Sequence, residues 1–104
     1  MSQNQIGALE IPVMTSAAQA LSNDVELFPG MPKKWGLSFL INTKTPPTGR
    51  SAGSLAWAGL ANTYFWIDRP RQVSGVFLSQ VLPFYDGPAI DLFGKFETEV
   101  YRAL

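Results

Sequence analysis

The strongest constraint on the fold is the run of β-forming and aromatic residues between Ser51 and Phe84, the densest in the chain. It contains two short apolar segments, SLAWAGL (54–60) and TYFWID (63–68), separated only by Ala61-Asn62. Asn tolerates a left-handed backbone conformation, which suits a tight turn between two antiparallel strands. The sequence therefore predicts a β-hairpin at the centre of a sheet.

Two further segments extend this sheet. WGLSFLIN (35–42) has apolar residues at alternate positions, the pattern of a strand with one strongly buried face. VSGVFLSQVLPF (73–84) has apolar residues on both faces, which indicates a long strand covered on both sides. Proline, glycine and polar residues make TKTPPTGRSAG (43–53) and DRPRQ (68–72) loops. The prediction is an antiparallel sheet of about four strands.

The C-terminal segment PAIDLFGKFETEVYRAL (88–104) is the best helix candidate. Its apolar residues recur at spacings of three and four and form one stripe. Asp86 precedes Pro88 at a helix start position, and Gly94 inside the helix indicates close packing against another element. The predicted fold class is α+β, with this helix on one face of an antiparallel sheet that spans residues 36–84.

Residues 1–35 have the weakest pattern. They are predicted to be irregular, with a short helix of two turns at TSAAQALSN (15–23) and a loop at FPGMPKK (28–34). The chain has 104 residues, of which 46% are hydrophobic and 15% charged. That composition predicts a packed single domain over residues 1–104.

Composition excludes several functional classes. The chain contains no cysteine and no histidine, so a Ser-His-Asp triad and a zinc site with His or Cys ligands are excluded. Net charge is zero and the longest basic run is Lys33-Lys34, so no binding to nucleic acid or to an anionic membrane is expected. No apolar run approaches the roughly 18 residues of a membrane span, and the N-terminus lacks a signal-peptide pattern. We expect a cytoplasmic chain without metal or cofactor.

Gly49-Arg50-Ser51-Ala52-Gly53 matches the G-x-S-x-G motif of α/β-hydrolases. That motif needs a strand before its serine, a helix after it and a histidine nearby. Here a proline-rich loop precedes the serine and a predicted strand follows, so the glycines are interpreted as serving the loop. The basic residues of the loops are interpreted as solvated charges, namely Lys33, Lys34, Arg50, Arg69 and Arg71.

A serine–lysine mechanism requires Lys one helical turn after the nucleophilic Ser. None of the eight serines has Lys three residues later, and no Tyr-x-Asn occurs. The sequence therefore supplies no catalytic residue that can be named. Tyr64, Phe65, Trp66 and the Phe84-Tyr85 pair are interpreted as core and sheet-edge packing rather than as a ligand cage.

The run GRSAGSLAWAGLANTYFWID (49–68), followed by residues 73–84, resembles the C-terminal part of serine β-lactamase-like esterases. These are the family VIII carboxylesterases, related to class C β-lactamases and penicillin-binding proteins. NQIG (4–7), residues 21–42 and LFGKFETEVYRAL (92–104) fit the same family. The resemblance implies a partial β-lactamase-like fold and an esterase that acts through an acyl-enzyme.

In that family the Ser and Lys of S-x-x-K and the Tyr of Y-x-N lie outside the C-terminal part, and a strand carrying K-T-G or W-x-G lines the pocket. By the resemblance, Trp57-Ala58-Gly59 is this strand element, and Leu60 offers its backbone N–H to the oxyanion hole. Gly59 lets the acyl group approach the backbone. The absence of Lys-Thr-Gly favours an ester over a β-lactam. The residues alone favour another interpretation, in which Trp57 is an ordinary half-buried strand aromatic and Gly59 relieves a bend.

Two functions follow as expectations. In the first, the chain is the C-terminal part of a β-lactamase-related serine hydrolase that acts on a small ester in its full-length context and is inactive alone. In the second, it is a non-catalytic small domain with an open sheet edge. Such an edge can pair with a second copy, giving a homo-oligomer, or with a complementing N-terminal chain.

Overall fold

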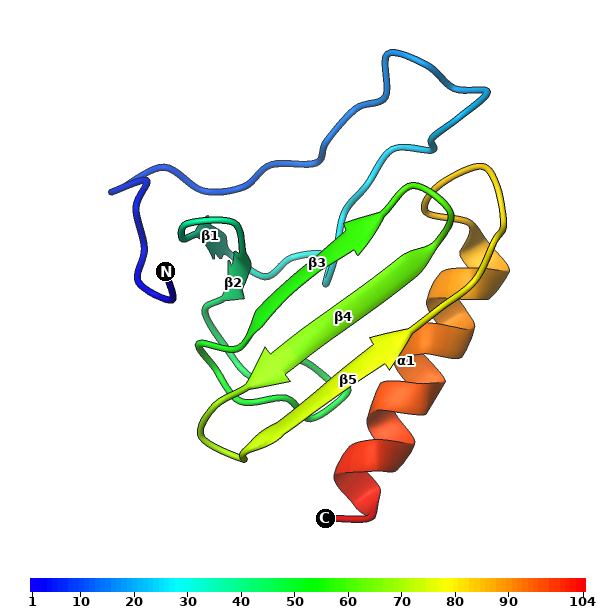
Figure 1. Cartoon of the computed structure of the whole chain (residues 1–104). Coiled ribbons are helices and arrows are strands. Elements are labelled where there is room, and N and C mark those ends of the chain that lie inside the picture. The colour runs from blue at the N-terminus through cyan, green and yellow to red at the C-terminus, as the bar shows by residue number, and fades with distance from the viewer.

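The computed structural model describes residues 1–104 as one five-stranded antiparallel sheet followed by one helix (Figure 1). The strands lie side by side in chain order, as in a meander. This architecture confirms the predicted α+β class, with five strands instead of about four. The elements are β1 (Lys33–Trp35), β2 (Leu40–Asn42), β3 (Leu55–Gly59), β4 (Thr63–Asp68), β5 (Val73–Phe77) and α1 (Gly87–Arg102).

The centre of the sheet is the predicted hairpin. Strands β3 and β4 pair along their full length, with Ala56 opposite Trp66 and Ala58 opposite Tyr64. The turn between them depends on Asn62, whose φ of 60° is the left-handed conformation expected from the sequence. The next turn, after β4, leads into β5, which pairs Gly75 with Trp66.

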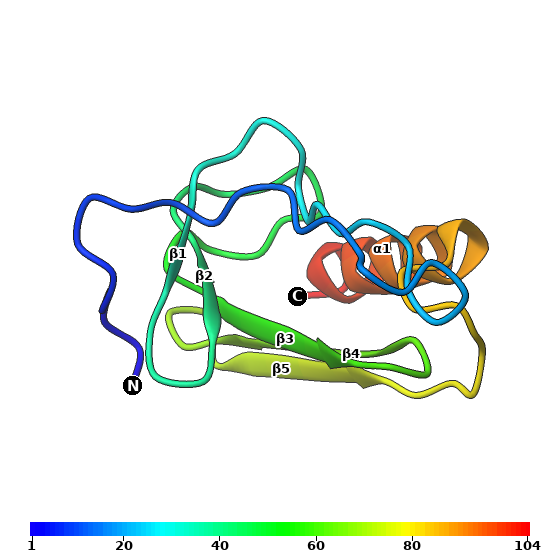
Figure 2. The ribbon, with the colours of Figure 1, turned by 90° about the horizontal axis from the view of Figure 1, so that it is seen from above.

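Helix α1 covers one face of the sheet, and the other face of β3, β4 and β5 is open (Figure 2). Asp86 caps the helix by accepting a hydrogen bond from the Ala89 N–H at 3.0 Å, so the predicted start position is confirmed. Ala89 and Phe93 are the apolar helix residues that are fully buried. Two residues of the predicted stripe, Leu92 and Phe96, are 55% and 39% exposed, so the helix contacts the sheet along a narrower strip than predicted. Leu104, the last residue predicted for the helix, lies beyond its end at Arg102.

The core is an aromatic cluster between α1 and the sheet. Tyr64, Trp66 and Phe93 are 1%, 0% and 5% exposed. The rings of Tyr64 and Phe93 stack with centroids 5.0 Å apart, and Trp66 meets Phe93 edge-on at 5.8 Å. Gly75 is required beside this cluster, because a Cβ there would lie 2.0 Å from the Trp66 ring. The interpretation of Tyr64 and Trp66 as core residues is confirmed.

The predicted strand at 35–42 is instead a hairpin. Strands β1 and β2 pair with each other, with Trp35 opposite Leu40. Residues 36–39 form the turn between them, where Ser38 has a φ of 76° and the Gly36 N–H donates to the Phe39 carbonyl at 2.9 Å. Alternating apolar residues were a poor guide here because two of them fall inside this turn.

The predicted long strand at 73–84 is also shorter. Strand β5 ends at Phe77, and residues 78–84 leave the sheet and lead to α1. They are held by side chains instead: the Ser79 hydroxyl donates to the carbonyls of Ala61 and Asn62, each at 2.8 Å. The prediction that this strand is covered on both faces was wrong, since Val76 and Leu78 are 59% and 76% exposed.

The N-terminal segment runs along the same side of the sheet as α1 (Figure 2). The two-turn helix expected at 15–23 is absent, and a single turn covers residues 19–21. Side chains compete for the backbone there: Asp24 accepts from the Ser16 N–H at 2.8 Å, and the Ser16 hydroxyl accepts from the Ala18 N–H at 3.1 Å. An isolated bridge between Met14 and Val25 closes the segment on itself, and a second one between Ser22 and Phe84 joins it to the residues before α1. No helix has the length and apolar character needed to cross a membrane.

Candidate functional site

Trp57 lies on the open face of the sheet, away from α1. Side chains alternate along a strand, and Ala56 and Ala58 pack toward the aromatic core on the helix side. Trp57 therefore points to the other face, where its ring meets that of Trp35 edge-on with centroids 4.7 Å apart. It is half-buried and pairs with Phe65 of β4.

The end of β3 has an unpaired edge. Strand β2 pairs only with Leu55 and Ala56, so β3 extends past it toward the turn (Figure 1). The Ser54 carbonyl accepts from the Asn42 N–H on this side at 3.3 Å. Because backbone groups alternate in direction along a strand, Ala58 also directs its N–H and carbonyl toward this side. Leu60 follows β3 as the first residue of the turn.

The N–H of Leu60 donates no hydrogen bond within the chain. Its side chain is 55% exposed. Gly59, next to it, is exposed and leaves the backbone accessible; its hypothetical Cβ meets only the Thr63 Cβ, at an ordinary 3.7 Å. The structure thus brings an aromatic side chain, an uncovered glycine and a free backbone donor to one strand end.

Asn62 fixes this strand end and was missed as a site residue by sequence reasoning. It is 0% exposed, and its amide uses every hydrogen-bonding position. The Nδ2 group donates to the carbonyls of Val81 and Pro83, each at 2.8 Å. The Oδ1 atom accepts from the Tyr64 hydroxyl at 2.6 Å and from the Asp86 N–H at 3.0 Å. Burial raises the pKa of Tyr64 to about 12, so this hydroxyl stays a donor at neutral pH.

Ser51 has no catalytic surroundings, in agreement with its interpretation as a loop residue. Its N–H donates to Asp68 at 2.8 Å, and its carbonyl accepts from Asn42 at 2.9 Å and from the Ser54 hydroxyl at 2.7 Å. Strand β3 follows at Leu55, where an α/β-hydrolase motif requires a helix. The backbone of Ser51 therefore serves to anchor the loop that leads into β3.

The interpretation of Arg50 as a solvated charge is wrong. Arg50 and Glu97 of α1 are 2% and 1% exposed and form a two-pronged ion pair, with Nε–Oε1 and Nη2–Oε2 distances of 2.5 Å. Thr48 donates to the same carboxylate at 2.8 Å, and the guanidinium lies 4.9 Å from the ring centre of Phe28. A partner 47 residues away leaves no signature in the local sequence.

Lys33 is the second basic residue that is buried, at 4% exposed. Its Nζ donates to the carbonyls of Met31 at 2.9 Å and Phe28 at 3.4 Å. Burial lowers the pKa of Lys33, against the attraction of Glu26 and Glu10.

Asp68 joins the 43–53 loop to α1 through hydrogen bonds. It is 0% exposed and accepts from the Tyr101 hydroxyl at 2.7 Å, from Ser51 N–H and from Arg71 N–H at 3.1 Å. Burial acts to raise the pKa of Asp68, but these hydrogen bonds outweigh it and hold the pKa below its ordinary value. Burial and the Asp68 carboxylate both raise the pKa of Tyr101. The Asp68 carboxylate has a structural role, because both of its oxygens already accept hydrogen bonds from within the chain.

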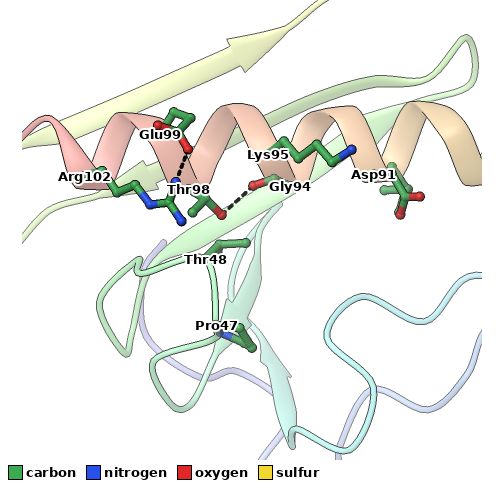
Figure 3. A pocket seen from close by; sticks show the side chains of 9 residues that line it. Pro47, Thr48, Asp91, Gly94, Lys95, Thr98, Glu99 and Arg102 are labelled. Atoms are coloured by element: carbon green, nitrogen blue, oxygen red, sulfur yellow. Dashed lines mark hydrogen bonds and ion pairs between the residues drawn. The ribbon is translucent and has the colours of Figure 1, made fainter.

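A shallow cleft of about 550 Å³ runs along the exposed side of α1 (Figure 3). Its walls are polar, with the side chains of Asp91, Lys95 and Glu99 on the helix and Thr48 on the facing loop. The dashed contacts in Figure 3 join Thr98 to the Gly94 carbonyl and Arg102 to Glu99. No group of three or more acidic, His or Cys side chains is arranged to hold a metal ion.

No family model matches the chain, and no curated protein matches it. Among solved structures, the chain is similar to the LovD9 mutant of simvastatin synthase from Aspergillus terreus. The TM-score is 0.67, with 25% identity over 70% of this chain. The matched region is only 19% of the simvastatin synthase chain. The five-stranded sheet with its C-terminal helix thus matches part of a β-lactamase-like fold.

Proposed function

We propose that this chain forms the strand wall of the acyl pocket in a β-lactamase-like serine hydrolase or acyltransferase. The observation that carries the proposal is the free N–H of Leu60 at the open end of β3. The similarity to simvastatin synthase supports the same reading, because that chain has a β-lactamase-like fold.

The Leu60 N–H would stabilise negative charge on the substrate. Attack on an ester carbonyl turns its oxygen into an oxyanion, and donors already in place stabilise it without reorganisation. The backbone amide of Leu60, in the turn that directly follows β3, is proposed as such a donor. The Asn62 hydrogen bonds hold the turn in position, so this N–H keeps its direction as charge develops.

Trp57, Ala58 and Gly59 would complete the wall. The Trp57 ring, packed against Trp35, offers a rigid apolar surface on the open face for an acyl chain. Ala58 fills the core side and fixes the strand. Gly59 has no side chain to keep the substrate away from the backbone. An ester suits these residues better than a β-lactam carboxylate, because no Lys-Thr-Gly cation is present.

The nucleophile would come from outside these 104 residues. No serine in the chain is followed by Lys three positions later, and the loop hydrogen bonds of Ser51 hold it within the loop. A separate segment or chain would therefore supply the Ser, Lys and Tyr, and the isolated chain would not turn over esters. The small ester is then a substrate of the assembled enzyme only.

A simple assay tests the inactivity of the isolated chain. The chain should hydrolyse p-nitrophenyl acetate and butyrate at the buffer rate, with Ser51→Ala as the matched variant. Turnover well above buffer that Ser51→Ala removes would contradict the proposal and restore Ser51 as a nucleophile.

A second candidate function is self-association through β5. This strand lies at the edge of the sheet; Val76 within it is 59% exposed, and Leu78 just after it is 76% exposed. Open edges with apolar side chains are templates for pairing with another chain. Light scattering during size-exclusion chromatography should then give a dimer that Val76→Lys returns to a monomer. A wild-type monomer at 100-fold dilution and at high concentration alike would count against it.

A further inference from the structure

A second cavity lies on the helix side of the sheet, between α1, residues 27–29 and Thr48. Its volume is about 190 Å³, and it is lined mainly by apolar side chains from both sides: Leu27, Phe28, Pro29, Ile90 and Phe93. It shares Thr48, Ile90 and Gly94 with the shallow cleft of Figure 3, so the two are adjacent.

Gly94 keeps this cavity open. A Cβ at Gly94 would have no other atom within 4 Å, so the close packing expected from the sequence is wrong. Glycine is less favourable than alanine in a helix interior. At this position it has no steric reason in the fold, and its effect is to leave room beside α1.

Two wall residues have a backbone conformation that bulky side chains rarely adopt. Phe28 and Tyr85 have φ angles of 51° and 60°, two of the five non-glycine residues with positive φ. Such strain persists only where surrounding contacts impose it, and it gathers at ligand sites. Here the contacts are present: the Tyr85 hydroxyl donates to the Glu26 carbonyl at 2.6 Å, and Lys33 Nζ donates to the Phe28 carbonyl.

The polar end of the cavity is already neutralised. Glu97 is a lining residue, but its carboxylate is occupied by Arg50 and Thr48. A charged ligand would meet no free counter-charge inside and would lose its hydration. The cavity therefore favours an uncharged molecule.

We propose that this cavity binds one small neutral molecule with an aromatic or branched aliphatic group. A cavity of about 150 Å³ lined by Leu, Ile and Phe is known to bind benzene, so the observed volume suits one ring or a fused pair. The site lies on the opposite side of the sheet from Trp57, so the proposal of a ligand here does not depend on the proposed acyl pocket.

Titration of the 15N-labelled chain with indole, followed by amide shifts, tests the proposal. Saturable shifts are expected at Gly94, Ile90 and Phe93. Gly94→Leu, which fills the cavity, should weaken binding at least tenfold. Lys95→Leu is the matched control: it places the same side chain on the next residue of α1, outside the cavity lining, and should leave affinity within twofold.

Intermolecular NOEs to the wild-type chain decide the case if Gly94→Leu does not fold. NOEs from indole protons to the side chains of Ile90 and Phe93 would support the proposal. Absence of saturable binding, NOEs only to residues elsewhere, or unchanged affinity in folded Gly94→Leu would overturn it.

Discussion

Arg50 Nε lies 2.5 Å from Glu97 Oε1, and both side chains are shielded from solvent. This pair joins the loop before β3 to the middle of α1. Because α1 packs against β4 and β3 continues from that loop, the pair helps to set where the proposed pocket wall begins. Because both charges are buried, removing either one should destabilise the fold.

Glu97→Leu should strongly destabilise the fold because it leaves the Arg50 guanidinium buried and unpaired. Removing one partner of a buried ion pair costs about 3–5 kcal/mol. Replacing both partners, as in Arg50→Met with Glu97→Leu, should recover most of that loss, since two apolar side chains need no partner. Urea unfolding of both variants measures this, and a single variant that loses less than about 1 kcal/mol would contradict a buried pair.

Gly75→Ala should destabilise the chain through a direct clash. Its Cβ would lie 2.0 Å from the Trp66 ring, which is fully buried and cannot move freely. Overpacking of this kind costs roughly 1–3 kcal/mol. Thermal unfolding followed by circular dichroism should show a lower Tm.

Gly94→Ala is the matched opposite case. The same added methyl group meets open space, so helix propensity alone decides, and we expect a gain of about 1 kcal/mol. Equal effects of the two substitutions would mean that the Trp66–Gly75 contact is not as close as described.

Stability should fall in acid because of Asp68. Hydrogen bonds hold its pKa in the folded chain below the ~3.9 of an unfolded Asp, so the unfolded state takes up the proton first. The stabilisation is therefore complete above pH ~4 and is lost as the pH falls from there through the folded-state pKa. Asp68→Asn should lower stability at pH 7 and flatten the loss below pH ~4, measured by unfolding free energy. Asp91→Asn, at an exposed helix position, is the control, and identical slopes for both variants would contradict the prediction.

Asn62→Gly separates the two roles of this residue. Glycine accepts the φ of 60° but provides no amide, so the hydrogen bonds to Val81, Pro83, Tyr64 and Asp86 are lost. We expect a loss of at least 2 kcal/mol, since an unsatisfied buried group costs about 1–3 kcal/mol. Faster hydrogen exchange should accompany it at Val81, whose N–H donates to the Ala61 carbonyl, and at Asp86, whose N–H loses its Asn62 acceptor. Wild-type stability in Asn62→Gly would show that backbone conformation alone holds the turn.

The parts of the fold that local pattern controls were predictable. The Asn62 turn fixes the β3–β4 hairpin, and the three- and four-residue spacing together with Asp86 fixes α1. These features depend on neighbours in the sequence, so the sequence alone carries them.

The parts that depend on distant partners were not predictable. The Arg50–Glu97 pair, the network of Asp68 and the early end of β5 all require contacts between segments far apart in the chain. The prediction of one strand over residues 35–42 was wrong for another reason. Ser38 adopts a left-handed backbone conformation in the turn between β1 and β2, and a serine in the sequence does not indicate that conformation. At the candidate site, the family resemblance is the basis for proposing Trp57 to Leu60 as a pocket wall, whereas the buried amide of Asn62 beside them was visible only in three dimensions.

The central proposal is that the Leu60 N–H serves as an oxyanion donor, and a chimera tests it most directly. The chain would replace the matching part of simvastatin synthase, and the kcat for acyl transfer would be compared for Leu60→Ala and Leu60→Pro. Both remove the side chain, but only proline removes the N–H. We predict that Leu60→Ala stays within a few-fold of the unmodified chimera and that Leu60→Pro loses roughly 10²–10³ in kcat. Equal kcat values for the two variants, both folded by circular dichroism, would contradict the proposal.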